Sequence, residues 1–410
     1  MRILHVNKFL FRKGGAEGYM EDLAALQERA GHSVGYWGMD HPQNTHVDLA
    51  DTFPCFVEFD NPPSGVVERA RMVGRMIWCR EAQRGMAEAI ERFRPDVAHL
   101  HNVYHQLSPS ILAPLHAADV PVVLTLHDYK LVCPTYQLLD HGEPCTACVG
   151  GKFWNAPLRR CRNGSFLASA TMAADLSVHT LTRSYRHVDA FICPSRFLAG
   201  QMERGRVYPD RMHVIRHFVD LAGVEAKSEP GGHAVIAGRI SAEKGIDVAI
   251  RAIGHLPDGV HLDVAGDGPA RADLEALAAV DAPGRVTFHG RLPKGELHDL
   301  LRRSGVAVVP STWYENQPMA VLEALAVGLA VIGSDLGGIP ELIDAGQDGL
   351  LVPPGDDKAL ATAIGELLGD ATRAFAMGQT GRQKIEAEFP PSLHLEHVSG
   401  LYRRIGAKGA

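Results

Sequence analysis

Two glutamates eight residues apart, Glu315 and Glu323, flank the segment Asn-Gln-Pro-Met-Ala-Val-Leu. The apolar run 306–310 before them predicts a buried strand. Pro318 suits the first position of a helix, where its missing N–H is not needed. Glu315 is therefore expected just before a helix, and Glu323 about a turn and a half inside it.

The first turn of this predicted helix offers backbone N–H groups to a ligand. The amides of Met319, Ala320 and Val321 have no intrahelical acceptor, so they and the helix dipole form an anion site. A phosphate bound there would lie between two carboxylates, one able to bind ribose hydroxyls and the other able to face a sugar. The segment therefore suits an enzyme that holds a nucleotide-sugar.

Basic side chains and one leucine follow two other predicted strands of the second half. Arg239 comes directly after the strand 234–238, and Lys244 begins the next helix. A planar guanidinium and a mobile ammonium there would clamp a diphosphate, although a solvated surface pair is the alternative. Arg291 and Leu292 follow the strand 285–290, where main-chain groups and an aliphatic face would receive a nucleobase or simply form a turn.

Polar side chains also end two strands of the first half. His127 and Asp128 follow the apolar run 122–126, and His101 ends the strand 97–101, with Tyr104 close behind. Ligands of open parallel sheets bind outside the carboxyl ends of the strands, so these residues are candidates for an acceptor site. The alternative is histidines whose partners are backbone groups.

Paired glycines follow two further strands. Gly15 and Glu17 open a helix after the first strand, where glycine permits close approach of a ligand or only a tight turn. Gly337 and Gly338 occupy an equivalent place in the second half, with the same two interpretations. The first pair lacks the six-residue spacing of the nicotinamide fingerprint, which argues against a dehydrogenase.

Four cysteines lie in or beside the long polar segment 129–164. The Cys-Thr-Ala-Cys spacing is typical of zinc ligands, and a loop of this length needs a staple, so a structural four-thiolate zinc site and unligated thiols are both open. The candidates are Cys133, Cys145, Cys148 and Cys161.

Composition limits the class of protein. The chain has 410 residues, 46% hydrophobic and 22% charged, which fits a globular enzyme of more than one domain. A net charge of −7 argues against nucleic-acid binding. No apolar run is long enough to span a bilayer, and residues 1–6 predict a strand rather than a signal peptide. Without a secretion signal, the seven cysteines favour a reducing compartment. The cytoplasm is expected.

Apolar runs of strand length alternate with amphipathic stretches, which predicts an α/β protein with parallel, doubly wound sheets. Predicted strands are 3–7, 33–37, 97–101, 121–127, 190–194, 234–238, 261–266, 285–290, 306–311, 330–334 and 350–352. Predicted helices include 16–30, 66–92, 195–204, 245–253, 297–303 and 357–368. A polar linker at 220–232 separates an acceptor-side domain, 1–220, from a nucleotide-sugar domain, 233–390, and 391–410 is expected to cross back to the first.

The predicted helix 66–92 carries a row of arginines. Such a face could meet the inner, anionic membrane surface, although a solvated face over a core-facing stripe is the commoner cause and glutamates dilute its charge. The arginines are Arg69, Arg71, Arg75, Arg80 and Arg84.

Taken together, these motifs resemble the retaining glycosyltransferases of family 4, also called glycosyltransferase group 1, over nearly the whole chain. The shared motifs are Gly14-Gly15-Ala16-Glu17, His127-Asp128, Gly238-Arg239 with Glu243-Lys244-Gly245, Glu315-x7-Glu323, and Gly337-Gly338-Ile339-Pro340-Glu341. The resemblance implies the GT-B fold, with two facing Rossmann-like domains and the active site in the cleft.

The resemblance also implies roles. Arg239, Lys244 and the helix amides would neutralise the diphosphate leaving group, and Glu323 would hold the ribose. Glu315 would contact the donor sugar and His127 a sugar hydroxyl near the reacting carbon. Anomeric configuration would be retained by front-face attack, which needs no protein base. No catalytic metal or other cofactor would be required. The product would be a cell-surface polysaccharide or glycoconjugate, built on a glycan or lipid-linked acceptor.

Two segments depart from the family pattern. Asn316-Gln317-Pro318 replaces a Gly-Phe-Gly type, and His217-Phe218 stands where Asn-Gly is common. One rival function is a sugar-nucleotide epimerase or phosphorylase of the same fold, and an epimerase would act on the donor with no acceptor present. Another is a catalytically silent sugar-nucleotide-binding protein, and the intact acidic and basic residues argue against it.

Overall fold

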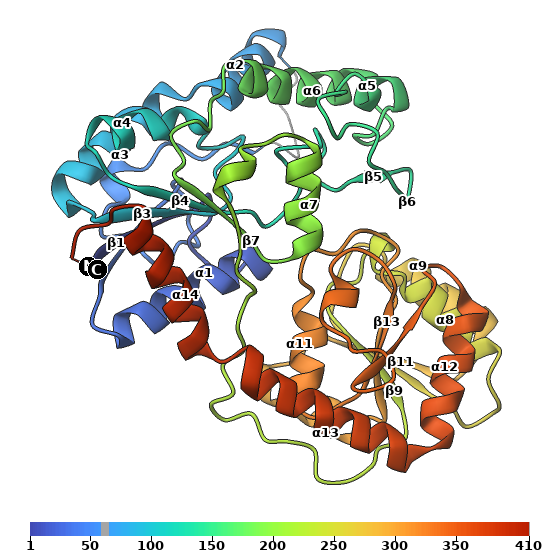
Figure 1. Cartoon of the computed structure of the whole chain (residues 1–410). Coiled ribbons are helices and arrows are strands. Elements are labelled where there is room, and N and C mark those ends of the chain that lie inside the picture. Colours follow the sequence, from blue (N-terminus) through green and yellow to red (C-terminus); the bar gives the residue numbers. More distant parts are fainter. Residues whose placement is uncertain (59–64, 410) are drawn as a thin grey trace. The chain divides into compact units, whose positions relative to one another are not determined.

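The computed structural model describes residues 1–58 and 65–409 (Figure 1). The chain divides into two compact units. Unit 1 comprises Met1–Gln137, Thr146–Arg216 and His394–Ala410, and unit 2 comprises Leu138–Cys145 and His217–Leu393. The division after Arg216 precedes the linker expected at 220–232, and the sequence did not predict that residues 138–145 group with unit 2.

Unit 1 contains a six-stranded sheet in the order β2-β1-β3-β4-β7-β8. Its strands are β1 (Arg2–Val6), β2 (Ser33–Trp37), β3 (Val97–Leu100), β4 (Val122–Thr125), β7 (Ala190–Cys193) and β8 (Met212–Val214). Every neighbouring pair is parallel, so all the carboxyl ends lie at one edge. The register sets His5 of β1 opposite His99 of β3.

Helices flank this sheet. They are α1 (Gly15–Arg29), α2 (Val66–Ile77), α3 (Arg80–Phe93), α4 (Leu112–Ala117), α5 (Asn155–Arg159), α6 (Phe166–Leu181), α7 (Arg196–Arg204) and α14 (Pro391–Arg404). Val398, Leu401 and Tyr402 of α14 are buried against Ile3 and Val97 of the sheet. Burying apolar side chains of this size contributes about 1.5–3 kcal/mol each, which holds the end of the chain on unit 1.

The single helix predicted at 66–92 is wrong, because the chain breaks between α2 and α3. Trp78 is extended, and Cys79 caps α3 by accepting a hydrogen bond from the Ala82 amide at 3.4 Å. Arg75 of α2 donates to Glu81 at 3.0 Å. The single helix that was expected to carry all five arginines is therefore not formed, and the side chain of Arg69 lies outside the described residues.

The polar segment 129–164 contains more structure than the sequence indicated. It includes the antiparallel strands β5 (Leu139–Asp140) and β6 (Glu143–Pro144), and α5 precedes the long helix α6, which was not predicted. The Lys130 ammonium lies 2.8 Å from a carboxylate oxygen of Asp175 on α6, and both side chains are buried. This ion pair fastens the start of the segment to α6.

Unit 2 has a second six-stranded parallel sheet, in the order β11-β10-β9-β12-β13-β14. Its strands are β9 (Ala234–Ala237), β10 (Leu262–Ala265), β11 (Val286–Gly290), β12 (Val306–Val309), β13 (Val331–Ser334) and β14 (Gly349–Val352). Its helices are α8 (Ile246–Gly254), α9 (Arg271–Asp281), α10 (Lys294–Arg303), α11 (Met319–Ala326), α12 (Asp357–Gly369) and α13 (Ala371–Glu388).

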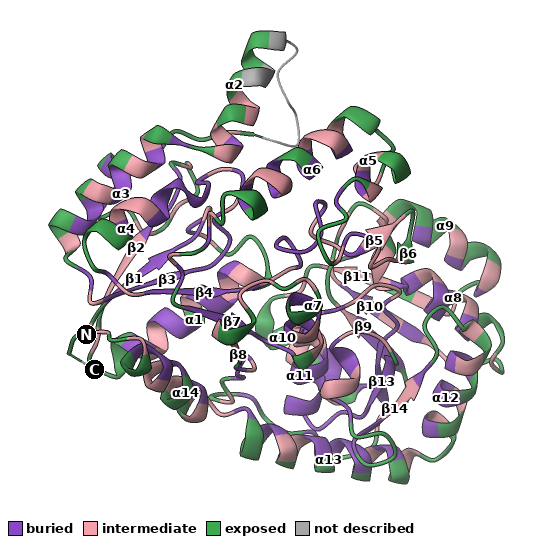
Figure 2. Ribbon diagram, turned by 45° about the horizontal axis from the view of Figure 1, so that its top comes forward, coloured by how far each residue is buried: buried purple, intermediate pink, exposed green. Residues whose placement is uncertain are grey.

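Apolar clusters lie on both faces of this second sheet. One joins the strands to α8, α9 and α12, and the other joins them to α10 and α11 (Figure 2). Strands buried on both faces explain the nearly continuous apolar runs in the sequence. The predicted α/β class with two parallel, doubly wound sheets is confirmed. Within the described ranges, no helix is both long and apolar enough to cross a bilayer.

Candidate active site

The carboxyl edge of the unit 2 sheet collects most of the predicted donor-side residues. Arg239 follows β9, Arg291 follows β11, and Glu315 lies in the loop between β12 and α11. Arg239 and Arg291 are exposed, whereas Leu292 packs against the apolar cluster of α10 and α11. The edge therefore presents cations outward over a buried aliphatic layer.

Glu315 is paired with Lys244 at this edge. The Lys244 ammonium donates to Glu315 Oε1 at 2.7 Å, and the Ser311 hydroxyl donates to the same oxygen at 2.8 Å. Glu315 is only 5% exposed, whereas the side chain of Lys244 is 30% exposed. Burial acts to raise the pKa of Glu315, but the Lys244 charge and the hydrogen bonds outweigh it and lower that pKa below its usual value. Glu315 is therefore a carboxylate at neutral pH.

The local sequence explains this pairing. Gly245 has φ +66°, and a Cβ there would lie 2.0 Å from the Pro310 carbonyl oxygen, so only glycine permits the approach. The Thr312 amide donates to the Glu243 carbonyl at 3.0 Å and joins the two loops. Lys244 and Glu315 meet because the segments that carry them are in direct contact.

The paired glycines Gly337 and Gly338 are required by the Glu315 loop itself. The Gly338 amide donates to the Glu315 carbonyl at 2.8 Å. A Cβ on Gly338 would lie 1.7 Å from the Asn316 carbonyl oxygen, and Gly337 has φ +65°. The geometry shows close contact with another segment of backbone, a role that neither of the two interpretations of this pair included.

Helix α11 begins one residue later than expected. Pro318 is its N-cap and not its first helical residue. The Val321 amide donates to the Pro318 carbonyl at 3.1 Å, so the prediction that it is open to an anion is wrong. The amides of Met319 and Ala320 meet no acceptor within the described part of the chain. Glu323 is half-buried on the same helix.

In unit 1, His127, Asp128 and Tyr104 line one small cavity together with His101 and Lys130. Burial lowers the pKa of His127 to about 3, so its imidazole is neutral at pH 7. Burial raises the pKa of Asp128 to about 6, although Asp128 accepts a hydrogen bond from the Lys130 amide at 2.9 Å. This cavity contains groups that can bind hydroxyls.

The other residues predicted on the acceptor side have protein partners. Glu17 of α1 is 6% exposed and accepts a hydrogen bond from Asn7 at 3.3 Å. His101 is 1% exposed and its ring nitrogens are 3.0 Å from His127 and 3.1 Å from His5, so both nitrogens have protein partners. Gly15, which was predicted on the donor side, is exposed at the start of α1.

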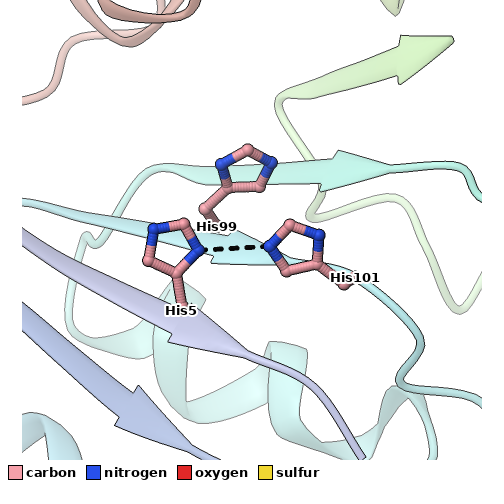
Figure 3. Close-up of side chains that lie close together, drawn as sticks. All are labelled: His5, His99 and His101. Carbon is pink, nitrogen blue, oxygen red and sulfur yellow. Dashed lines mark hydrogen bonds between the residues drawn. The ribbon is translucent and has the colours of Figure 1, made fainter. Parts of the chain in front are cut away.

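His5, His99 and His101 lie close together (Figure 3). One possible ligand atom from each falls within 4.8 Å of the others, the spacing of a metal site. Both nitrogens of His5 are nevertheless used, by His101 at 3.1 Å and by Gln27 at 2.7 Å. Both nitrogens of His99 are used by Tyr402 at 2.6 Å and Thr125 at 2.7 Å. The arrangement is that of a hydrogen-bonded cluster and not a ligand set held open for a metal.

The cysteines of unit 1 are distributed over more than one place. Cys148 and Cys161 pack in one apolar cluster with α5 and α6, and the Cys133 thiol lies 3.4 Å from the Thr135 hydroxyl. Among the described residues of unit 1, Cys133, Cys148 and Cys161 do not form a group of three sulfurs that all lie within 4.8 Å of one another. The zinc site stays a prediction.

Sequence reasoning missed several side chains around the site. Ser311 donates to Glu315, and the amide oxygen of Gln317 accepts from the His217 amide at 2.7 Å, so the two atypical segments meet each other. His5 and His99 were also missed. The available signal was histidine inside apolar strands, with His99 and His101 two residues apart and therefore on one face.

The architecture and the comparisons identify the class and then the family. Two Rossmann-like parallel sheets in one chain are the GT-B fold, and Anabaena Alr3699/HepE in complex with UDP superposes with a TM-score of 0.68 at 17% identity, covering 98% of this chain and 100% of that one. Residues 13–222 match the model of Glycosyltransferase Family 4, and residues 232–370 match Glycosyl transferases group 1. The chain belongs to glycosyltransferase family 4.

Two curated relatives indicate the range of the family. Alpha-maltose-1-phosphate synthase of Mycobacterium tuberculosis is 28% identical over 76% of this chain and 79% of that protein. Alpha-D-kanosaminyltransferase of Streptomyces kanamyceticus is 32% identical over 41% of this chain and 45% of that protein. The chain thus spans less than half the length of the second relative.

Proposed function

We propose that this protein is a retaining glycosyltransferase that uses a nucleoside-diphosphate-sugar. The observation that carries the proposal is the Lys244–Glu315 pair at the carboxyl edge of the unit 2 sheet, close in sequence to the open amides of α11. A cation, a buried carboxylate and a helix N-terminus are the groups that a diphosphate and its sugar require. The UDP in the HepE structure supports the same class of donor.

Each group has a distinct role in this proposal. Lys244, Arg239 and the amides of Met319 and Ala320 stabilise the charge that develops on the departing diphosphate. The bond from the anomeric carbon to phosphate oxygen breaks, the bond to the acceptor oxygen forms on the same face, and the acceptor proton moves to the departing phosphate oxygen. Glu323 binds the ribose, and Glu315 contacts the donor sugar.

Unit 1 supplies the remaining groups. His127 contacts a sugar hydroxyl, and Asp128 and Tyr104 contribute to the acceptor side. In unit 2, Arg291 and Leu292 receive the nucleobase on the donor side. The acceptor is a glycan or a lipid-linked sugar of a cell-surface polysaccharide or another glycoconjugate.

A thermal-shift screen against UDP, GDP, ADP, CMP and NADH tests the proposal. A ligand that binds only the folded state raises Tm, so one nucleoside diphosphate is expected to stabilise the protein selectively, by about 2.7 kcal/mol at a hundred times its Kd. Stabilisation by NADH alone would support a dehydrogenase instead. Turnover of the sugar donor without any acceptor would support the epimerase.

We propose separately that the four cysteines bind zinc, and only their spacing in the sequence supports this. If Cys133, Cys145, Cys148 and Cys161 share one structural zinc, protein purified without added metal should contain about one zinc per chain. Replacing Cys145 with serine should remove most of it, whereas replacing the core residue Cys193 should not. Metal-free protein with an unchanged Tm would exclude the site.

We also propose a peripheral contact between unit 1 and the inner membrane, at a surface other than α2. Trp154, Leu158, Phe166 and Leu167 are between 56% and 71% exposed, and the cations Lys152 and Arg160 lie in the same segment. Exposed aromatic and leucine side chains among cations are typical of surfaces that bind anionic lipid.

Sedimentation with lipid vesicles tests this contact. Binding is expected to vesicles that contain phosphatidylglycerol and not to pure phosphatidylcholine. The double variant Trp154→Ser, Leu158→Ser should lower the bound fraction by roughly fivefold or more, since each lost side chain removes about 1.5 kcal/mol or more of transfer energy. Val280→Ser, at an equally exposed position on α9, is the control. Equal sedimentation of all three proteins would contradict the proposal.

A further inference from the structure

A chain of buried hydrogen bonds leads inward from His127. His127 Nε2 lies 3.0 Å from His101 Nδ1, His101 Nε2 lies 3.1 Å from His5 Nδ1, and His5 Nε2 lies 2.7 Å from Gln27 Oε1. Figure 3 shows the link between His5 and His101. Both His5 and His101 are at most 1% exposed, so these contacts are shielded from water.

The chain continues to the C-terminal helix α14. Gln27 Nε2 donates to the Tyr402 hydroxyl at 3.1 Å, which lies 2.6 Å from His99 Nδ1, and His99 Nε2 lies 2.7 Å from the Thr125 hydroxyl. All of these residues belong to unit 1.

The amide group of Gln27 determines the direction of the bonds around it. Gln27 Nε2 donates to the Tyr402 hydroxyl, which must then donate its own proton to His99 Nδ1. Burial lowers the pKa of His99 well below its ordinary value, so the ring is neutral and donates from Nε2 to the Thr125 hydroxyl.

The same amide directs the bonds that lead back to the cavity. Because the Gln27 nitrogen donates to Tyr402, the Gln27 oxygen faces His5 and receives the proton on His5 Nε2. Burial lowers the pKa of His5 to about 4, so His5 is neutral and its Nδ1 accepts from His101.

We infer that His101 is a positioning residue, which holds His127 in the tautomer with the proton on Nε2 and the lone pair on Nδ1. His101 Nδ1 is an acceptor in this network, because its own proton is donated to His5 from Nε2. His127 must then donate from Nε2, and Nδ1 can only accept. Tyr402 places part of this control on α14, which is more than two hundred residues along the chain.

This inference rests on the proposed function only for its chemical consequence. If Nδ1 of His127 can only accept a hydrogen bond, it favours a substrate group that donates one, such as a sugar hydroxyl, over a carbonyl or carboxylate at the same position. The effect of the network is to hold the His127 ring in one hydrogen-bonding state.

Nitrogen NMR of ¹⁵N-histidine-labelled protein tests the tautomer without substrate. At pH 7 in the wild type, His127 should show an unprotonated Nδ1 and a protonated Nε2. A protonated Nδ1 in the wild-type protein would overturn the inference, whatever the activity of the protein. Failure of the nucleotide screen with the expected tautomer would instead count against the proposed function alone.

Two substitutions separate positioning from folding. His101→Leu removes the acceptor for His127, so both tautomers should appear and kcat should fall about tenfold with little change in the KM for the donor nucleotide. His101→Asn places an amide oxygen near the position of Nδ1 and should restore the single tautomer and most of kcat. An equal loss of kcat in both variants with an unchanged His127 spectrum would overturn the positioning role. If neither variant folds, the wild-type spectrum still decides.

Discussion

Replacing Glu315 with glutamine is expected to lower kcat by about a hundredfold or more, while the Kd of the nucleoside diphosphate changes by less than about threefold. Glutamine has nearly the same shape and keeps the acceptor oxygen that faces Ser311, so the loop should stay folded. The lost charge would weaken contacts to the donor sugar. It would also release Lys244 from its 2.7 Å pairing, which can only favour binding of the diphosphate.

Single-turnover kinetics and calorimetry measure the two quantities separately. Glu366→Gln, which removes an exposed carboxylate from α12 of the same unit, is the matched control and should behave as the wild type. Equal losses in turnover and nucleotide affinity would contradict the assignment of Glu315 to the sugar. They would indicate that its main role is to support the phosphate site.

Replacing Lys244 with alanine is expected to weaken nucleoside diphosphate binding by about tenfold or more, because a charge-assisted bond to phosphate is lost. Folding should also suffer, by about 1–3 kcal/mol at pH 7, since Glu315 would keep a buried charge without its cation. Calorimetry with the diphosphate and urea unfolding measure the two effects.

The stability loss should depend on pH with a definite sign. Lys244 helps to lower the pKa of Glu315 in the folded state. The contribution of this pair to the free energy of unfolding is therefore fully present above the unfolded pKa of about 4.3. It is lost as pH falls through the lower folded value, so wild type and variant should converge in acid. Lys358→Ala, at an exposed site on α12, is the control. Unchanged diphosphate affinity of Lys244→Ala would remove this residue from the clamp.

The sequence by itself determined the two parallel sheets and the residues at their carboxyl edges. Strands buried on both faces require continuous apolar runs, and helices require amphipathic ones, so local periodicity is enough to predict the alternation. Arg239, His127 and Glu315 were identified because each follows such a run. Local periodicity failed at Trp78, where the pattern of apolar residues continued through a break in the helix.

Only the tertiary structure decided which of these groups contact each other. Lys244 and Glu315 are 71 residues apart, His5 and His101 are 96 apart, and Gln27 and Tyr402 are 375 apart. Gly245 and Gly338 look like ordinary turn residues in the sequence, yet each is required by the backbone of another segment. Such contacts depend on strand order and on the close approach of loops. The spacing of residues along the chain contains no direct record of either, so the tautomer of His127 and the pairing of Glu315 could be read only from the folded protein.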